Sequence, residues 1–240
     1  MRALSALAFV CLPVTLSATT LVVFRTPTAV ILATDSAAVE LDETGKHHMQ
    51  VDCKIRPSGR WWFVIGGFLR DSHGDMRDVV ATSIANTTTI QAALAAIDDH
   101  SLSDHIRANR ALYKGRQAGS PLMTIVIADT TMIVGVFMVS LKTADPFEVM
   151  VETGTCPGTL CATGSYYLVG EPGDAPPNPL LKALPSWFQR GDAAAARQFI
   201  TEQIAFTPLL ARHPIDVLEI TTTGARWVGR EESSACASIP

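Results

Sequence analysis

The spacing of the hydrophobic residues changes several times along the chain, and this succession limits the fold more than any other feature. Apolar and β-branched runs, which are typical of strands, come first, over 20–25, 29–33, 49–55 and 61–65. The polar stretch 40–47 between them is predicted to be a loop. Helical spacing then extends from Asp75 to about Gln117 and predicts two or three helices.

The second half of the chain returns to strands. Strand-like runs cover 122–128, 132–141, 147–152 and 165–170. Asp192 is the predicted N-cap of one more helix, and 215–220 with 225–228 form a closing hairpin. The order strands, helices, strands, helix, strands predicts an α+β fold. Two antiparallel sheets stacked between helical layers account for it.

Length and composition narrow the class of protein. A chain of 240 residues forms one domain with a sizeable core, and 48% hydrophobic with 18% charged residues is a globular composition. The net charge of -4 provides no electrostatic footprint for nucleic acid and no cationic patch for a membrane surface. No apolar run reaches the roughly 18–20 residues that a membrane-spanning helix needs.

The first residues have the pattern of a signal peptide. Arg2 supplies a positive charge, 3–13 is an apolar segment, and small or polar residues follow up to Ala18, although Leu16 occupies a position where a small residue is preferred. We expect 1–18 to be removed on export to the periplasm or the exterior, leaving a domain over 19–230 and a flexible tail over 231–240. The alternative is a short buried N-terminal helix.

The cysteine count agrees with export. Removal of the leader leaves an even number, Cys53, Cys156, Cys161 and Cys236. Cys156 and Cys161 flank a turn-rich Pro-Gly-Thr-Leu segment and are predicted to form a disulfide, with two free thiols as the alternative. The pairing of Cys53 and Cys236 is left open. The histidine pairs have no carboxylate cluster beside them, so neither a metal site nor a cofactor is predicted.

Cleavage after Ala18 would make Thr19 the first residue. An N-terminal threonine carries a hydroxyl nucleophile and a free α-amine on one residue. The reference pKa of that amine is about 7.7–8.0, close enough to neutrality to accept the proton of the hydroxyl. Thr19 is therefore the candidate nucleophile.

Three further residues are predicted to lie near Thr19. Asp35 follows it by sixteen residues, at the end of a hairpin that Thr19 begins, so the two ends should lie side by side. Lys54 ends the next strand, where an ammonium would favour ionisation of the hydroxyl. Gly66 ends the strand after that, where a backbone N–H can hold the oxyanion of an acyl-transfer intermediate.

These residues resemble the proteasome β-subunit pattern of the N-terminal nucleophile hydrolases. The resemblance rests on Thr19-Thr20-Leu21, on the Ala-Thr-Asp-Ser that ends 29–36, on Lys54 and on Ile65-Gly66-Gly67. It needs an insertion of about three residues before Lys54. The stretch 162–167 is similar to the family's Gly-Ser-Gly-Ser strand start, with Thr163 at the assisting serine. Individual residues match the family pattern over 19–67, whereas from there to about 229 only the order of the elements matches.

The resemblance implies a four-layer αββα sandwich and a role for each residue. Thr19 would be the nucleophile and its own amine the base, acting through a water. Asp35 would hold Lys54, Lys54 would lower the pKa of the hydroxyl, Gly66 would form the oxyanion hole and Thr163 would support the amine. The candidate substrate-binding residues are mixed in character: Ala38, Asp52, Val64 and Phe68.

Two features depart from the family pattern. The stretch 207–214 lacks the Asp and Ser that the family places near the terminal amine, and Ala18, not Gly, precedes the nucleophile. We predict an exported threonine-type amidohydrolase that acts on a peptide or small amide, with a peptidase as the preferred interpretation. The resemblance also implies assembly as a ring or dimer. The alternatives are a catalytically silent structural or binding subunit and a non-peptide amide hydrolase or acylase.

Overall fold

The computed structural model describes residues 14–16, 20–41, 47–67, 69–71, 74–113, 115–161, 166–172, 190–208, 211–230 and 236–239. In these ranges the helices are α1 (Met76–Ile84), α2 (Ile90–Ala96), α3 (Asp99–Ala108) and α5 (Ala193–Phe206), with a short 3-10 helix at Arg110–Tyr113. Side chains of Asp75, Thr89, Asp98 and Asp192 accept backbone N–H groups as N-caps. None of the described helices is long and apolar enough to span a membrane.

The described strands form two large sheets. One has six strands in the order β1 (Val14–Leu16), β13 (Tyr166–Pro172), β2 (Leu21–Arg25), β3 (Val30–Asp35), β14 (Ile215–Thr221) and β15 (Gly224–Trp227). The other has five, β12 (Glu148–Cys156), β11 (Val134–Thr143), β10 (Pro121–Ala128), β7 (Trp61–Gly67) and β6 (Ile55–Ser58). All neighbours are antiparallel except β1 and β13.

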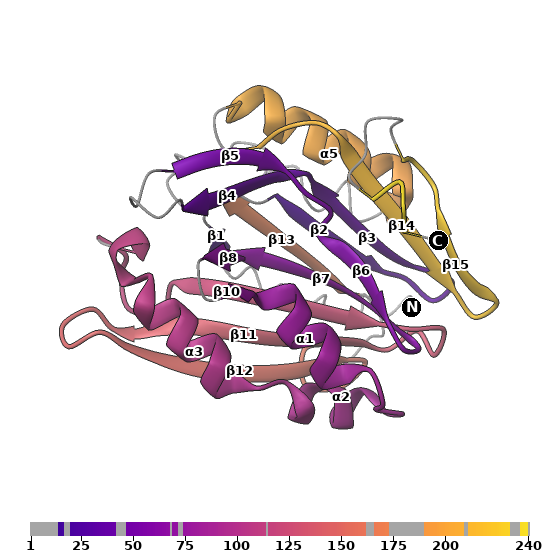
Figure 1. Ribbon diagram of the computed structural model, residues 1–240. Coiled ribbons are helices and arrows are strands. Elements are labelled where there is room, and N and C mark those ends of the chain that lie inside the picture. Colours follow the sequence, from indigo (N-terminus) through magenta and orange to yellow (C-terminus); the bar gives the residue numbers. More distant parts are fainter. Residues whose placement is uncertain are drawn as a thin grey trace, which may run out of the picture.

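The buried side chains form three separate hydrophobic clusters. In β2, Val22 packs with α5 whereas Leu21 packs toward β7 and β10 of the other sheet. In β7, Val64 faces that same inter-sheet core, whereas Phe63 packs with α1 to α3. Figure 1 shows α5 on one side of the molecule and α1 to α3 on the other. Because both faces of these central strands are buried, their sequences read as nearly continuous apolar runs.

The expected combination of helices and antiparallel sheets is confirmed, but two local expectations are wrong. The single strand expected over 49–55 is interrupted: β5 (His47–Val51) ends before Asp52, and β6 begins at Ile55. The loop expected over 40–47 contains the end of β4 (Ala37–Leu41) and the start of β5, whereas 42–46 lies outside the described residues.

A small third sheet was not expected. Within the described part of the chain its order is β5, β4, β8 (Arg70–Asp71) and β9 (Gly74–Asp75). Two-residue strands are too short to show any hydrophobic period, and this is why the sequence gives no sign of β8 and β9.

Described segments near both ends of the chain take part in the fold. The N-terminal helix that was the alternative to a leader is not found at 14–16, which form β1 beside β13, and 1–13 lies outside the described residues. Of the expected tail, the structure describes 236–239, where Cys236 is buried and joined to Cys53. Loss of 1–18 would remove β1 and leave β13 at the edge of the sheet.

Candidate active site

The carboxylate of Asp35 is the centre of a buried polar cluster at the end of β3. Its Oδ1 accepts hydrogen bonds from Lys54 Nζ at 2.9 Å and from the backbone N–H of Thr20 at 2.8 Å. Its Oδ2 accepts from the backbone N–H groups of Ala37 at 2.9 Å and Arg212 at 3.1 Å. Both oxygens therefore act only as acceptors, and each receives two donors.

The β2–β3 hairpin brings Asp35 to the start of β2. The two strands pair from Leu21–Thr34 to Arg25–Val30, and the Asp35 N–H donates to the Thr20 carbonyl at 3.2 Å. Thr19 itself lies outside the described residues. The residue that follows it in the sequence is thus bound to the Asp35 carboxylate through its own N–H.

Lys54 is the cation of this cluster. Its side chain and that of Asp35 are both 0% exposed, and its ammonium lies 2.9 Å from Asp35 Oδ1. Burial lowers the pKa of Lys54; Asp35 opposes this effect, and the nearby Arg77 guanidinium adds to it. The result is a charged group in a dry environment whose pKa lies below the usual lysine value.

Arg77, near the start of α1, holds the segment that carries Lys54. Its Nη1 donates to the carbonyl of Cys53 at 3.0 Å, and its Nη2 lies 2.5 Å from Asp52 Oδ2 and 2.6 Å from Asp75 Oδ2. The guanidinium is completely buried. Burial alone would raise the pKa of Asp75, but hydrogen bonds from Arg77 and Arg70 hold it well below its usual range. Both residues before Lys54 are therefore fixed by one side chain.

Gly66 lies at the end of β7, opposite Thr124 of β10. On the other side of β7, the described pairing with β6 ends at Ile55–Val64, two residues before Gly66. Gly66 is thus beyond the end of that ladder.

The backbone at position 67 requires a glycine. Its φ is +126°, and a Cβ at this position would lie 2.8 Å from the Leu122 carbonyl oxygen. We expect Gly67→Ala to destabilise the fold by about 1–3 kcal/mol, because the backbone angle and the contact both oppose a side chain. Gly119→Ala is the control, since Gly119 has a φ of +85° but open space around it. Urea unfolding of both variants measures the difference; equal losses would contradict the close contact.

The predicted substrate-binding residues lie in different surroundings. Ala38 is half-buried in β4, Asp52 is 20% exposed and paired with Arg77, and Val64 is fully buried between the two large sheets. Phe68, like the predicted catalytic Thr19 and Thr163, lies outside the described residues.

The loop before β14 contacts Asp35 through its backbone. Besides the Arg212 N–H bound to the carboxylate, the Arg212 carbonyl accepts from the Ser36 N–H at 3.2 Å. This loop belongs to the stretch where the family pattern has an Asp and a Ser. The role of Arg212 had no signal in the sequence, because a backbone contact does not depend on residue type.

Two disulfides are present among the described residues. One joins Cys156 and Cys161, the pair expected from their turn-rich spacing, and the other joins Cys53 and Cys236 across 183 positions. The second bond ties the C-terminal segment to the residue just before Lys54. In the described ranges, no group of three or more His, Cys, Asp or Glu side chains is placed to hold a metal ion.

Loss of the Cys53–Cys236 disulfide should destabilise the fold more than loss of the Cys156–Cys161 disulfide. We expect the Cys53→Ser/Cys236→Ser double variant to lose about 2–5 kcal/mol of stability, because the bond closes a very long loop in the unfolded chain. The Cys156→Ser/Cys161→Ser variant, which opens a loop with a separation of 5, should lose less. Equilibrium unfolding in urea compares the two; an equal or inverted order would contradict this account.

Comparison with known proteins finds structural similarity but no matching family. No family model matches the chain, and no curated protein matches it. Among solved structures, the chain is similar to a Thiobacillus denitrificans protein, BPH, in complex with epoxomicin. The two chains share 14% sequence identity with a TM-score of 0.43, over 85% of this chain and 98% of the other.

Proposed function

We propose that the chain is an exported threonine-type amidohydrolase of the N-terminal nucleophile kind, acting on peptides, with Thr19 as nucleophile after removal of 1–18. In this proposal α5, the two large sheets and α1 to α3 are the four layers of an αββα sandwich. The two disulfides are of the kind that persists in an oxidising compartment, and this supports export.

The observation that carries the proposal is the buried Lys54–Asp35 pair bound to the residue after Thr19. Removing two charges from water costs several kcal/mol per ion, and an apolar pair of similar volume is often at least as stable. Ionisable groups in such surroundings gather at functional sites. Here Asp35 Oδ1 receives both the Lys54 ammonium and the Thr20 N–H, so the cation lies beside the start of β2.

The proposed reaction is an acyl transfer. The Thr19 hydroxyl oxygen attacks the substrate carbonyl, and its proton passes through a water to the Thr19 amine, which Thr163 supports. Lys54 favours the ionised hydroxyl, and the Gly66 N–H binds the oxyanion. The protonated amine then gives this proton to the leaving nitrogen as the substrate C–N bond breaks. Water hydrolyses the ester left on Thr19 and restores the free hydroxyl and amine.

The pH profile should reflect the charge of Lys54. A lysine whose pKa is lowered loses its proton below the ordinary value of about 10.4, so activity should decline, as the pH rises, before that value is reached. Because the Arg77 charge contributes to the lowering, Arg77→Gln should move this decline to higher pH. The measurement is kcat against pH, with the more exposed Arg70→Gln as control. A decline at the same pH in Arg77→Gln would contradict the assignment.

The experiment that tests the proposal compares two chains that differ by one residue. One is prepared to begin at Thr19 and the other at Ala18, and both are assayed on a library of fluorogenic peptides. We expect hydrolysis by the first chain only, its loss in Thr19→Ala, and its partial retention in Thr19→Ser. Equal turnover by the two chains, or by Thr19→Ala, would refute the mechanism.

A silent subunit is the second candidate, and one observation favours it. The loop before β14 presents the Arg212 backbone to Asp35, in a stretch without the Asp and Ser of the family pattern. If the chain beginning at Thr19 binds peptides but hydrolyses none, this candidate is correct. Turnover of small N-acyl amides, without turnover of peptides, would instead identify an acylase.

A further inference from the structure

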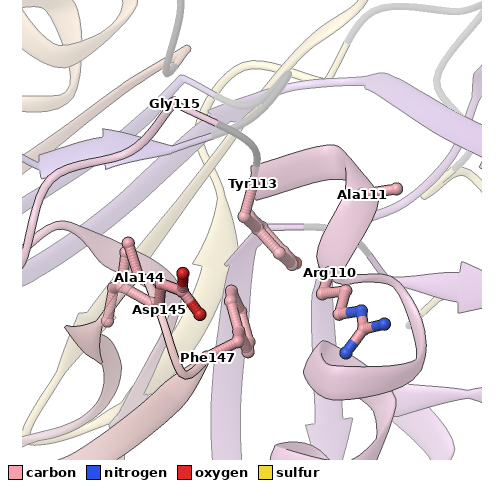
Figure 2. A pocket seen from close by; sticks show the side chains of 8 residues that line it. Arg110, Ala111, Tyr113, Gly115, Ala144, Asp145 and Phe147 are labelled. Atoms are coloured by element: carbon pink, nitrogen blue, oxygen red, sulfur yellow. The ribbon is translucent and has the colours of Figure 1, made fainter.

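A cavity of about 470 Å³ lies apart from the Asp35–Lys54 cluster, between the 3-10 helix after α3 and the turn that joins β11 to β12. Figure 2 shows it from close by. Its volume falls within the range of about 300–1,000 Å³ that is usual for small-molecule sites. The described residues that line it are Arg110, Ala111, Tyr113, Gly115, Leu141, Ala144, Asp145 and Phe147.

Two aromatic rings form the apolar part of the cavity. The ring centroids of Tyr113 and Phe147 are 6.4 Å apart with the planes inclined by 25°. Tyr113 is only 3% exposed, and its hydroxyl has no hydrogen-bond partner in the described part of the chain. Burial raises the pKa of this phenol, although Arg116 opposes the effect, so it stays a protonated donor. An unpaired buried hydroxyl is costly, and a ligand with an acceptor would relieve that cost.

Two opposite charges lie among the described lining residues. Arg110 and Asp145 are both exposed side chains, and neither forms an ion pair or a hydrogen bond with any described residue. Figure 2 shows them on opposite sides of the ring pair, with Tyr113 and Phe147 between them. A lone exposed charge is ordinarily solvated and means little. Here two unpaired charges and an unpaired buried donor surround one aromatic surface.

We propose that this cavity binds a short peptide with free ends and an apolar or aromatic side chain. The peptide carboxylate would pair with Arg110 and its ammonium with Asp145, while the side chain packs on Tyr113 and Phe147 and a peptide carbonyl accepts from the Tyr113 hydroxyl. A peptide carries its two charges at opposite ends, and this matches the placement of Arg110 and Asp145 on opposite sides of the ring pair. The inference depends on the cavity alone and holds whether or not Thr19 hydrolyses peptides.

The test uses calorimetric titration of the Thr19→Ala chain, in which no turnover can occur, with the dipeptide alanyl-phenylalanine. Two analogues remove one charge each: the N-acetyl dipeptide and the dipeptide amide. Because ion pairs with exposed side chains contribute at most about 1 kcal/mol, each analogue should bind roughly 2- to 5-fold more weakly than the free dipeptide.

Variants assign each charge to its partner. Arg110→Gln should abolish the preference for the free dipeptide over the amide and leave its preference over the N-acetyl form. Asp145→Asn should do the reverse. Tyr113→Phe should weaken binding without lowering the melting temperature, since it removes an unpaired hydroxyl and keeps the ring. Arg107→Gln is the matched control, because Arg107 is an exposed arginine of α3 that pairs with Asp104 and does not line the cavity.

The same titrations can overturn the inference. Equal binding of the three ligands, or no binding at millimolar concentration, would refute it. Unchanged preferences in Arg110→Gln and Asp145→Asn would refute it as well, because the peptide would then be bound elsewhere. A chain that binds the dipeptide but lacks hydrolytic activity when it begins at Thr19 would refute the proposed function and leave this inference intact.

Discussion

Asp35→Asn is expected to lose about 3–5 kcal/mol of stability and all hydrolytic activity. The substitution leaves the Lys54 ammonium buried without its counter-charge, and breaking a buried pair in this way costs that amount. An asparagine cannot substitute for the carboxylate, since both oxygens of Asp35 receive two donors. Its NH₂ group would face two N–H donors whichever way the amide is turned. Urea unfolding and peptide hydrolysis measure the two effects.

The matched control is Asp192→Asn. Asp192 also accepts a backbone N–H, as the N-cap of α5, but asparagine caps a helix about as well as aspartate. We therefore expect its stability to change by less than about 0.5 kcal/mol. Equal stability of Asp35→Asn and Asp192→Asn would contradict the buried Asp35–Lys54 ion pair.

Arg77→Met is expected to cost a similar amount, about 3–5 kcal/mol, although the side chain lies outside the reaction itself. Its removal leaves Asp52, Asp75 and the Cys53 carbonyl without their buried donor. Arg77→Lys should recover only part of the loss, because an ammonium cannot reproduce the planar fork of the guanidinium.

Arg70→Met is the control that distinguishes the effect of burial from the effect of charge. Arg70 pairs with the same two carboxylates, at 3.7 Å from Asp52 and 2.9 Å from Asp75, but is 39% exposed. Exposed pairs contribute about 0–1 kcal/mol, and the variant should lose no more than that. Equal losses on thermal or urea unfolding of the two methionine variants would contradict the buried position of Arg77.

The sequence predicts the parts of this fold that depend on local pattern. The apolar runs of β2, β3, β7 and β10 and the N-cap at Asp192 are visible without a structure. So is the position of Asp35 beside the start of β2, because hairpin geometry requires it.

Contacts between distant segments have no such signal. Arg77 begins its helix like any exposed arginine, and nothing near it indicates that it binds the residues before Lys54. The bond from Cys53 to Cys236 cannot be chosen from spacing alone. The cavity lined by Tyr113 and Phe147 combines a 3-10 helix with a turn about 30 residues later, so its lining is not contiguous in the sequence.

The central claim is that Thr19 becomes the first residue, and the intact mass with the N-terminal sequence of the mature protein tests it most directly. The protein should be recovered from its native cell and from the surrounding medium. We expect a chain that begins at Thr19, with both disulfides formed. A chain that begins at Ala18 or earlier would leave the Thr19 hydroxyl without a free amine as its base, and would contradict the proposed mechanism.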